Sequence, residues 1–124
     1  APPGDGVVRL GWTGREGATL EWVRTRAATR LVRVPIGADT LRAQVERLER
    51  MLRRGEEGSA TDALRRALYA VLVAPAEPEL AEARVLELEA DGVLGRLPFA
   101  VLRDASGRAL VERAALRYRA AVLP

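Results

Sequence analysis

Cysteine and histidine are both absent from the 124 residues of this chain. Without cysteine, these residues can form no disulfide framework, no thiolate zinc site and no thiol nucleophile. Without histidine they lack the commonest general base, the Ser-His and Cys-His nucleophile pairs and imidazole metal ligands. The composition therefore predicts a segment with no catalytic residue of these kinds, no metal site and no cofactor.

Lysine and asparagine are absent too, so all 20 basic residues are arginine. The 17 acidic residues reduce the net charge to +3, and Arg alternates with Glu in most segments. A nucleic-acid surface usually gathers its basic residues on one face. This alternation argues against a nucleic-acid partner. The alternative, an arginine-rich nucleic-acid binder, predicts affinity that falls steeply with salt.

Long apolar runs are missing, and none approaches the ~20 residues that a membrane span needs. The opening residues APPGDG have neither the basic nor the apolar region of a signal peptide. They lack an initiator Met and resemble the end of a linker. We therefore expect residues 1–6 to be a linker and the chain to be part of a longer, cytoplasmic protein that makes no membrane contact.

Residues 7–37 carry three short stretches rich in strand-forming residues: Val7–Trp12, Thr19–Thr25 and Thr29–Val34. Gly14–Gly17 is typical of a turn between the first two. Short connections between strands favour an antiparallel meander. Leu20 and Trp22 alternate onto one face, and we expect Trp12 and Trp22 to cover its buried side.

Residues 38–74 predict a pair of helices. Asp39 or Thr40 is expected to cap the first helix, which runs to about Arg54. Ser59 to Asp62 resembles a capping box for the second helix, which runs to about Val73. The apolar positions recur at helical spacing and make one stripe on each helix; they are Leu41, Val45, Leu48 and Leu52, then Leu64, Leu68, Val71 and Leu72.

Residues 75–124 predict a buried strand over Arg84–Glu89, a turn at Asp91 and Gly92, and then two short strands or one interrupted strand. The last two stretches are Ala109–Glu112 and Ala115–Arg119. The fold class is therefore α+β or α/β. Carboxylates that can do acid–base work or bind divalent cations occur in one group, but without calcium-loop spacing: Glu77, Glu79, Glu82, Glu87 and Glu89.

A motif of the form DG-x-L-x-x-LPF-x-x-L runs from Asp91 to Leu102. Its framework residues are Asp91, Gly92, Leu94, Leu97, Pro98, Phe99 and Leu102. Before it come Leu72–Pro75 and the strand Arg84–Leu88, and after it Leu110–Glu112 and Leu116–Tyr118. In these features the chain resembles the N-terminal portion of a CHAT domain, a caspase-like family of clan CD cysteine peptidases usually fused to TPR repeats.

The resemblance implies the first strands of a mostly parallel caspase-like sheet covered by helices. In that family the catalytic His and Cys lie on later strands, so neither can be assigned to a residue here, and Gly95 stands where many relatives carry a histidine. We expect the non-catalytic N-terminal segment of a bacterial CHAT peptidase, which scaffolds the catalytic part and docks a TPR or sensor region. The partners would be the remainder of the same protein or another chain.

A segment that holds only the first strands of such a sheet would expose a sheet edge and an apolar face. We expect an under-covered apolar patch at Val85, Leu88, Leu116 and Tyr118. The alternative to a peptidase segment is a stand-alone interaction module that associates through its exposed sheet edge.

Overall fold

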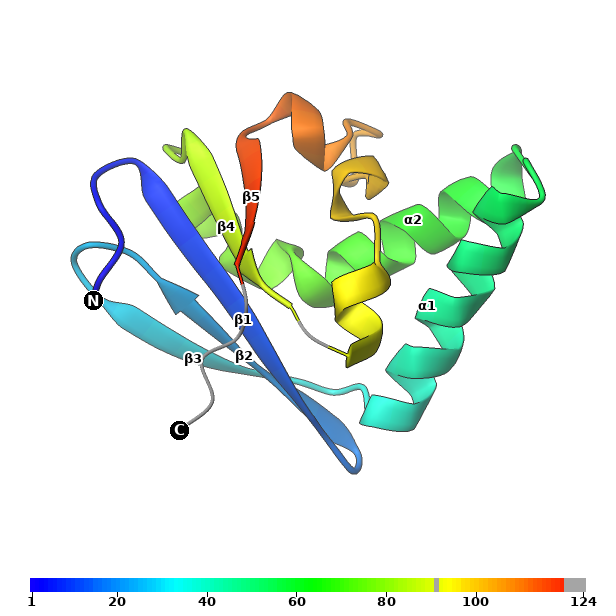
Figure 1. The fold of residues 1–124 in the computed structure, drawn as a ribbon, viewed down its shortest axis with the longest axis horizontal. Helices are drawn as coiled ribbons and strands as arrows, with labels where there is room; N and C mark the ends of the chain where they lie inside the picture. The colour runs from blue at the N-terminus through cyan, green and yellow to red at the C-terminus, as the bar shows by residue number, and fades with distance from the viewer. Residues whose placement is uncertain (91, 120–124) are drawn as a thin grey trace.

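The computed structural model describes residues 1–90 and 92–119, and it contains a mixed sheet with helices packed beside it (Figure 1). In this part of the chain the sheet has five strands in the order β3-β2-β1-β4-β5. The strands are β1 (Val7–Arg15), β2 (Ala18–Arg24), β3 (Thr29–Val34), β4 (Val85–Glu89) and β5 (Ala115–Arg119). The α+β class predicted from the sequence is confirmed.

The first three strands form the predicted antiparallel meander. β1 continues to Arg15, so the turn is shorter than expected and Gly14 pairs within the ladder. Gly17 supplies the turn with a backbone φ of +77°, which glycine adopts without steric penalty.

The meander joins the later strands through β1, which pairs in parallel with β4. β4 in turn pairs in parallel with β5. The domain boundaries expected near residues 37 and 74 stay a prediction. The strands before and after the helices nevertheless share one continuous sheet.

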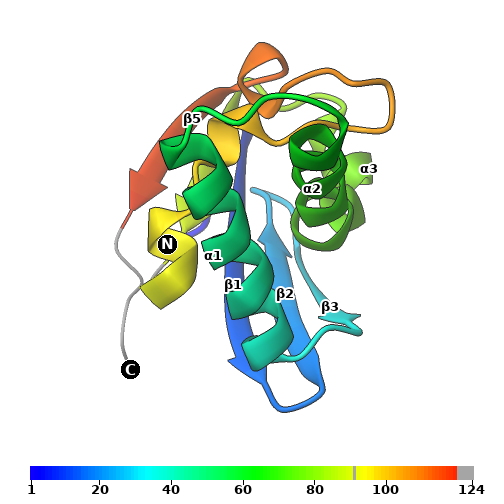
Figure 2. The same cartoon turned by 90° about the vertical axis from the view of Figure 1, so that its right-hand side faces the viewer.

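Two helices, α1 (Ala38–Arg53) and α2 (Ser59–Leu72), lie together on one face of the sheet (Figure 2). The remaining helical pieces are one turn or little more: η1 (Ala74–Ala76), α3 (Glu77–Leu80), η2 (Gly92–Arg96), η3 (Phe99–Val101) and η4 (Leu110–Glu112). In residues 1–90 and 92–119, no helix has the length and apolar character needed to cross a membrane.

The helix starts differ from the expected caps. Gly37 and Gly58 hold the N-cap positions, and neither helix has a side-chain cap. Asp39 therefore lies within the first turn of α1, where its negative charge interacts favourably with the positive end of the helix dipole. Ser59 is the first residue of α2, so the predicted capping box does not form.

The two tryptophans lie on opposite faces of the sheet, which corrects the expectation that both cover the buried side. Trp12 is 6% exposed and belongs to the core between the sheet and the helices. Trp22 pairs with Gly11, and its ring covers that glycine on the other face. Glu21 takes the core-facing position opposite Trp12.

Gly11 is required by this arrangement. A Cβ atom placed there would lie 2.3 to 2.5 Å from the Trp22 ring. We expect Gly11→Ala to destabilise the fold by about 1–3 kcal/mol, the usual effect of overpacking, measured by urea unfolding. Gly4→Ala is the matched control, since a Cβ atom there would meet nothing within 4 Å. Equal stability of the two variants would contradict the role given to Gly11.

The prediction of a strand at Ala109–Glu112 is wrong. Leu110–Glu112 forms the 3-10 turn η4, and only Ala109 makes a bridge, to Arg103. The backbone N–H of Leu110 donates to the carbonyl of Leu102, which holds η4 against the end of η3. The short apolar run thus forms a turn whose Leu110 side chain is buried in the core. Ala115–Arg119 is a strand, as expected.

Candidate functional site

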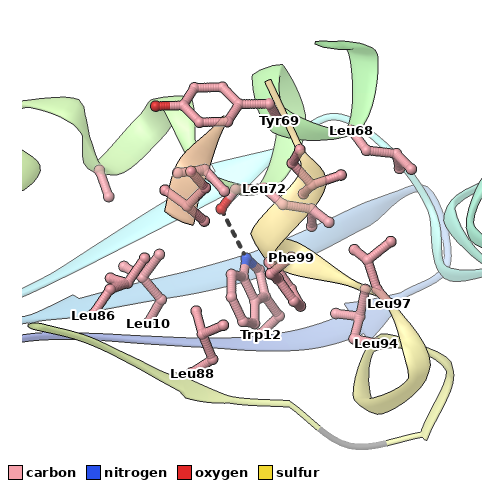
Figure 3. Close-up of a cluster of buried hydrophobic side chains, with 14 of the residues drawn as sticks. Leu10, Trp12, Leu68, Tyr69, Leu72, Leu86, Leu88, Leu94, Leu97 and Phe99 are labelled. Atoms are coloured by element: carbon pink, nitrogen blue, oxygen red, sulfur yellow. Dashed lines mark hydrogen bonds between the residues drawn. The ribbon is translucent and has the colours of Figure 1, made fainter. Parts of the chain in front are cut away.

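The predicted framework motif lies at the centre of the core (Figure 3). Leu94, Leu97, Phe99 and Leu102 are all buried. The Phe99 ring stacks on Trp12 with ring centroids 5.1 Å apart, and it contacts the Tyr118 ring in an edge-on arrangement with centroids 6.4 Å apart. The motif therefore joins β1, η3 and β5 by aromatic contact.

Two further features hold this framework in place. The indole N–H of Trp12 donates to the Leu72 carbonyl at 3.2 Å, which ties β1 to the end of α2 (Figure 3). Gly92 opens η2 with a φ of +55°. Pro98 is half-buried and precedes η3. Asp91, the other predicted framework residue, lies outside the described residues.

The acidic group noted in the sequence does not converge on one site. Arg30 donates two hydrogen bonds to the Glu79 carboxylate, one to each oxygen, at 2.7 and 2.9 Å. Glu77 accepts from Arg113 at 2.7 Å, and Glu87 accepts from Arg9 at 3.0 Å. Within residues 1–90 and 92–119, no three acidic side chains are grouped to hold a metal ion.

The comparison with protein families matches the CHAT domain to residues 62–123, half of the chain. The chain belongs to the CHAT family. A comparison with curated proteins finds no match. The matched region includes α2 from Asp62 onward, β4, the framework motif and β5.

Family membership makes this chain a module related to caspase-like peptidases. Its 124 residues contain no His or Cys, so the CHAT catalytic pair has no counterpart among them. At Gly95, where many CHAT proteins carry a histidine, the structure has room for a side chain. A Cβ atom there would lie 3.4 Å from the nearest atom, the Ala90 carbonyl oxygen. The departure at Gly95 is therefore not imposed by packing.

In the part of the chain that the structure describes, β5 is an edge strand of the sheet. Of the four residues expected to form an under-covered apolar patch, Leu88 is fully buried, while Val85 and Leu116 are half-buried. Tyr118 is 51% exposed. The expected patch is thus limited to the β5 side, because Phe99 and the core cover the β4 residue Leu88.

The sheet face opposite the helices is charged, not apolar as expected. Arg9 donates to Glu87 at 3.0 Å and lies 3.6 Å from Glu89, and Arg117 donates to Glu87 at 2.9 Å. Burial alone would raise the pKa of Glu87, but the hydrogen bonds from Arg9 and Arg117 hold it below its usual range.

Arginine predominates on this uncovered face. The strand registers put six arginines there, against the two glutamates Glu87 and Glu89: Arg9, Arg15, Arg24, Arg33, Arg117 and Arg119. Trp22 and the 66%-exposed Leu31 lie between them as cross-strand neighbours. The basic face could not be seen in the sequence, where Arg and Glu alternate. Strand pairing brings arginines from separate strands together on one face of the sheet.

Glu21 is a buried titratable group whose environment the sequence did not reveal. It is 0% exposed, and both carboxylate oxygens lack a hydrogen-bond partner in the described structure. Burial raises the pKa of Glu21 to about 8. The side chain is therefore mostly protonated at neutral pH, which avoids an unpaired buried charge.

Proposed function

We propose that this CHAT segment is the non-catalytic N-terminal part of a bacterial, cytoplasmic caspase-like cysteine peptidase. Its role is to scaffold the strands that carry catalysis and to dock a TPR or other sensor region. The observation that carries the proposal is the open edge of β5, a strand parallel to β4 and fastened to the buried framework motif.

The unpaired backbone groups of that edge support the scaffolding role. In the described part of the chain, β5 pairs only with β4, so its outer backbone N–H and C=O groups face away from the sheet. An added strand would satisfy those groups and cover Leu116 and the exposed Tyr118 ring. Phe99 contacts the β5 residue Tyr118 and stacks on Trp12, so β5 is anchored to the core on one face.

The docking role is supported by the uncovered basic face. A partner there would bring apolar side chains to Trp22 and Leu31 and carboxylates to the surrounding arginines. Charge complementarity of this kind sets partner choice and association rate more than affinity. A sensor region whose surface is acidic and amphipathic would match both the arginines and the apolar side chains of this face.

Hydrogen exchange can test the scaffold proposal with two polypeptides, residues 1–124 and the remainder of the protein produced separately. We expect the amides of Ala115–Arg119 to gain protection on mixing, while those of the α1 surface do not change. The coding sequence beyond Pro124 gives a second check, since a strand ending in His-Gly and a later strand ending in Cys are expected. Unchanged exchange at β5, or absence of both motifs, would contradict the proposal.

The second candidate is a stand-alone interaction module that associates through its sheet edges. It is favoured by β3, the opposite edge strand, which is mostly exposed and carries Leu31. Size-exclusion chromatography over a range of concentrations separates the candidates. A dimer that forms through β3 without any further segment would support the module, whereas a concentration-independent monomer would count against it.

A further inference from the structure

A hollow of about 680 Å³ lies beside α2, and none of its lining residues belongs to β5 or to the basic face. We call it the α2 pocket. Its walls come from α2 and η1 on one side and the loop Asp104–Arg108 on the other, and Glu77 and Arg113 close one end. No part of the scaffold proposal uses this pocket.

The two carboxylates of the pocket are already engaged. One Asp104 oxygen accepts hydrogen bonds from the backbone N–H groups of Ser106 and Arg108 and from the Ser106 hydroxyl. One Glu77 oxygen accepts from Arg113 at 2.7 Å and from the Tyr69 hydroxyl. The Ser106 hydrogen bond lowers the pKa of Asp104; burial opposes ionisation of Glu77, but Arg113 and Tyr69 hold its pKa below the usual range.

The three arginines of the pocket retain unused donors. The Arg108 guanidinium makes one hydrogen bond within the described residues, to the Glu112 carbonyl at 2.8 Å. Arg66 donates to Asp62 and to the Ala105 carbonyl, both at 2.9 Å, and its remaining terminal nitrogen lies over Gly107. Arg113 is the third guanidinium in the pocket lining; it pairs with Glu77 at 2.7 Å and lies 3.7 Å from Asp104.

The space between the arginines is lined by small side chains. Ala70 and Ala74 form the α2 and η1 wall, and Ala105 lies on the loop opposite. Such a wall accepts a short aliphatic chain, while a guanidinium fork matches the planar geometry of a carboxylate.

We propose that the α2 pocket binds a carboxylate carried on a short aliphatic stem. An acidic side chain of a peptide and a free small carboxylic acid share this chemistry. Chemical-shift titrations of the ¹⁵N-labelled chain distinguish the two sources with butyrate and with N-acetyl-glutamate amide as probes. Butyramide is the neutral control, and inorganic phosphate tests for a general anion site.

We expect butyrate, N-acetyl-glutamate amide or both to shift the amides of Asp104–Arg108, and butyramide to shift none of them. The tighter of the two probes identifies the source. Equal shifts with butyramide would overturn the proposal because they would show that the carboxylate is not recognised. Tighter binding of phosphate than of either carboxylate would overturn it as well.

Two pairs of variants locate the site without disturbing the core. Arg108→Gln removes an exposed pocket guanidinium, and we expect at least fivefold weaker butyrate binding; Arg42→Gln, on the exposed side of α1, is its matched control and should bind normally. Ala70→Leu fills the pocket and should abolish binding, whereas Ala67→Leu, also exposed on α2 but outside the pocket, should not. Unchanged affinity in Arg108→Gln or in Ala70→Leu would overturn the proposal.

Discussion

Phe99→Ala is expected to lower the free energy of unfolding by about 3–5 kcal/mol, the usual range for removing a buried aromatic ring. Phe99 is 0% exposed and contacts both Trp12 and Tyr118, so its loss opens a cavity where three elements meet. Domains of this size are stable by only about 5–15 kcal/mol. A large share of the stability of the CHAT segment therefore depends on this one side chain. Urea unfolding followed by tryptophan fluorescence measures the change.

Val111→Ala is the matched control, since Val111 is 56% exposed and we expect its truncation to change the unfolding free energy by less than about 0.5 kcal/mol. Phe99→Leu keeps most of the apolar volume and should fall between the two. If Phe99→Ala were as stable as Val111→Ala, the framework motif would not be the anchor that joins β1 to β5.

The sequence predicted well the features that depend on neighbouring residues. β3 and β5 occupy the expected residues, and the helical stripe of α1 buries Leu41, Val45 and Leu48. The framework motif could be recognised because its spacing is local and specific. The parallel pairing of β1 with β4 could not be predicted, because the two strands are separated in sequence by both helices.

The face of β2 that is buried was predicted wrongly. The sequence offers two alternating sets, and the more apolar one contains Leu20 and Trp22. The structure buries the set of Thr19, Glu21 and Val23 instead. A one-residue change of register would exchange the two faces, and Gly11 favours the observed one by giving room to the Trp22 ring outside the core. Glu21 enters the core as a consequence.

The burial of Glu21 determines how its ionisation affects stability. Its pKa is about 8 in the folded chain, against a reference value of 4.5. Because the folded state binds the proton more tightly, the stabilisation is fully present below about pH 4.5. It is lost as the pH rises towards 8 and stays lost above that. Glu77, Glu79 and Glu87 have lowered pKa values, so their contributions act in the opposite direction, at acid pH.

Glu21→Gln should therefore remove a stability loss that the unmodified chain undergoes between pH 4.5 and about 8. One pKa unit corresponds to about 1.4 kcal/mol, so the loss reaches about 3 kcal/mol by pH 7. The measurement is the difference in unfolding free energy between the two proteins at several pH values, which cancels the contributions of the other carboxylates. Glu16→Gln, at the exposed turn after β1, serves as the control and should keep the original slope. A constant difference between Glu21→Gln and the unmodified chain over this window would mean that Glu21 is already ionised in the fold, and that an unrecognised partner satisfies its charge.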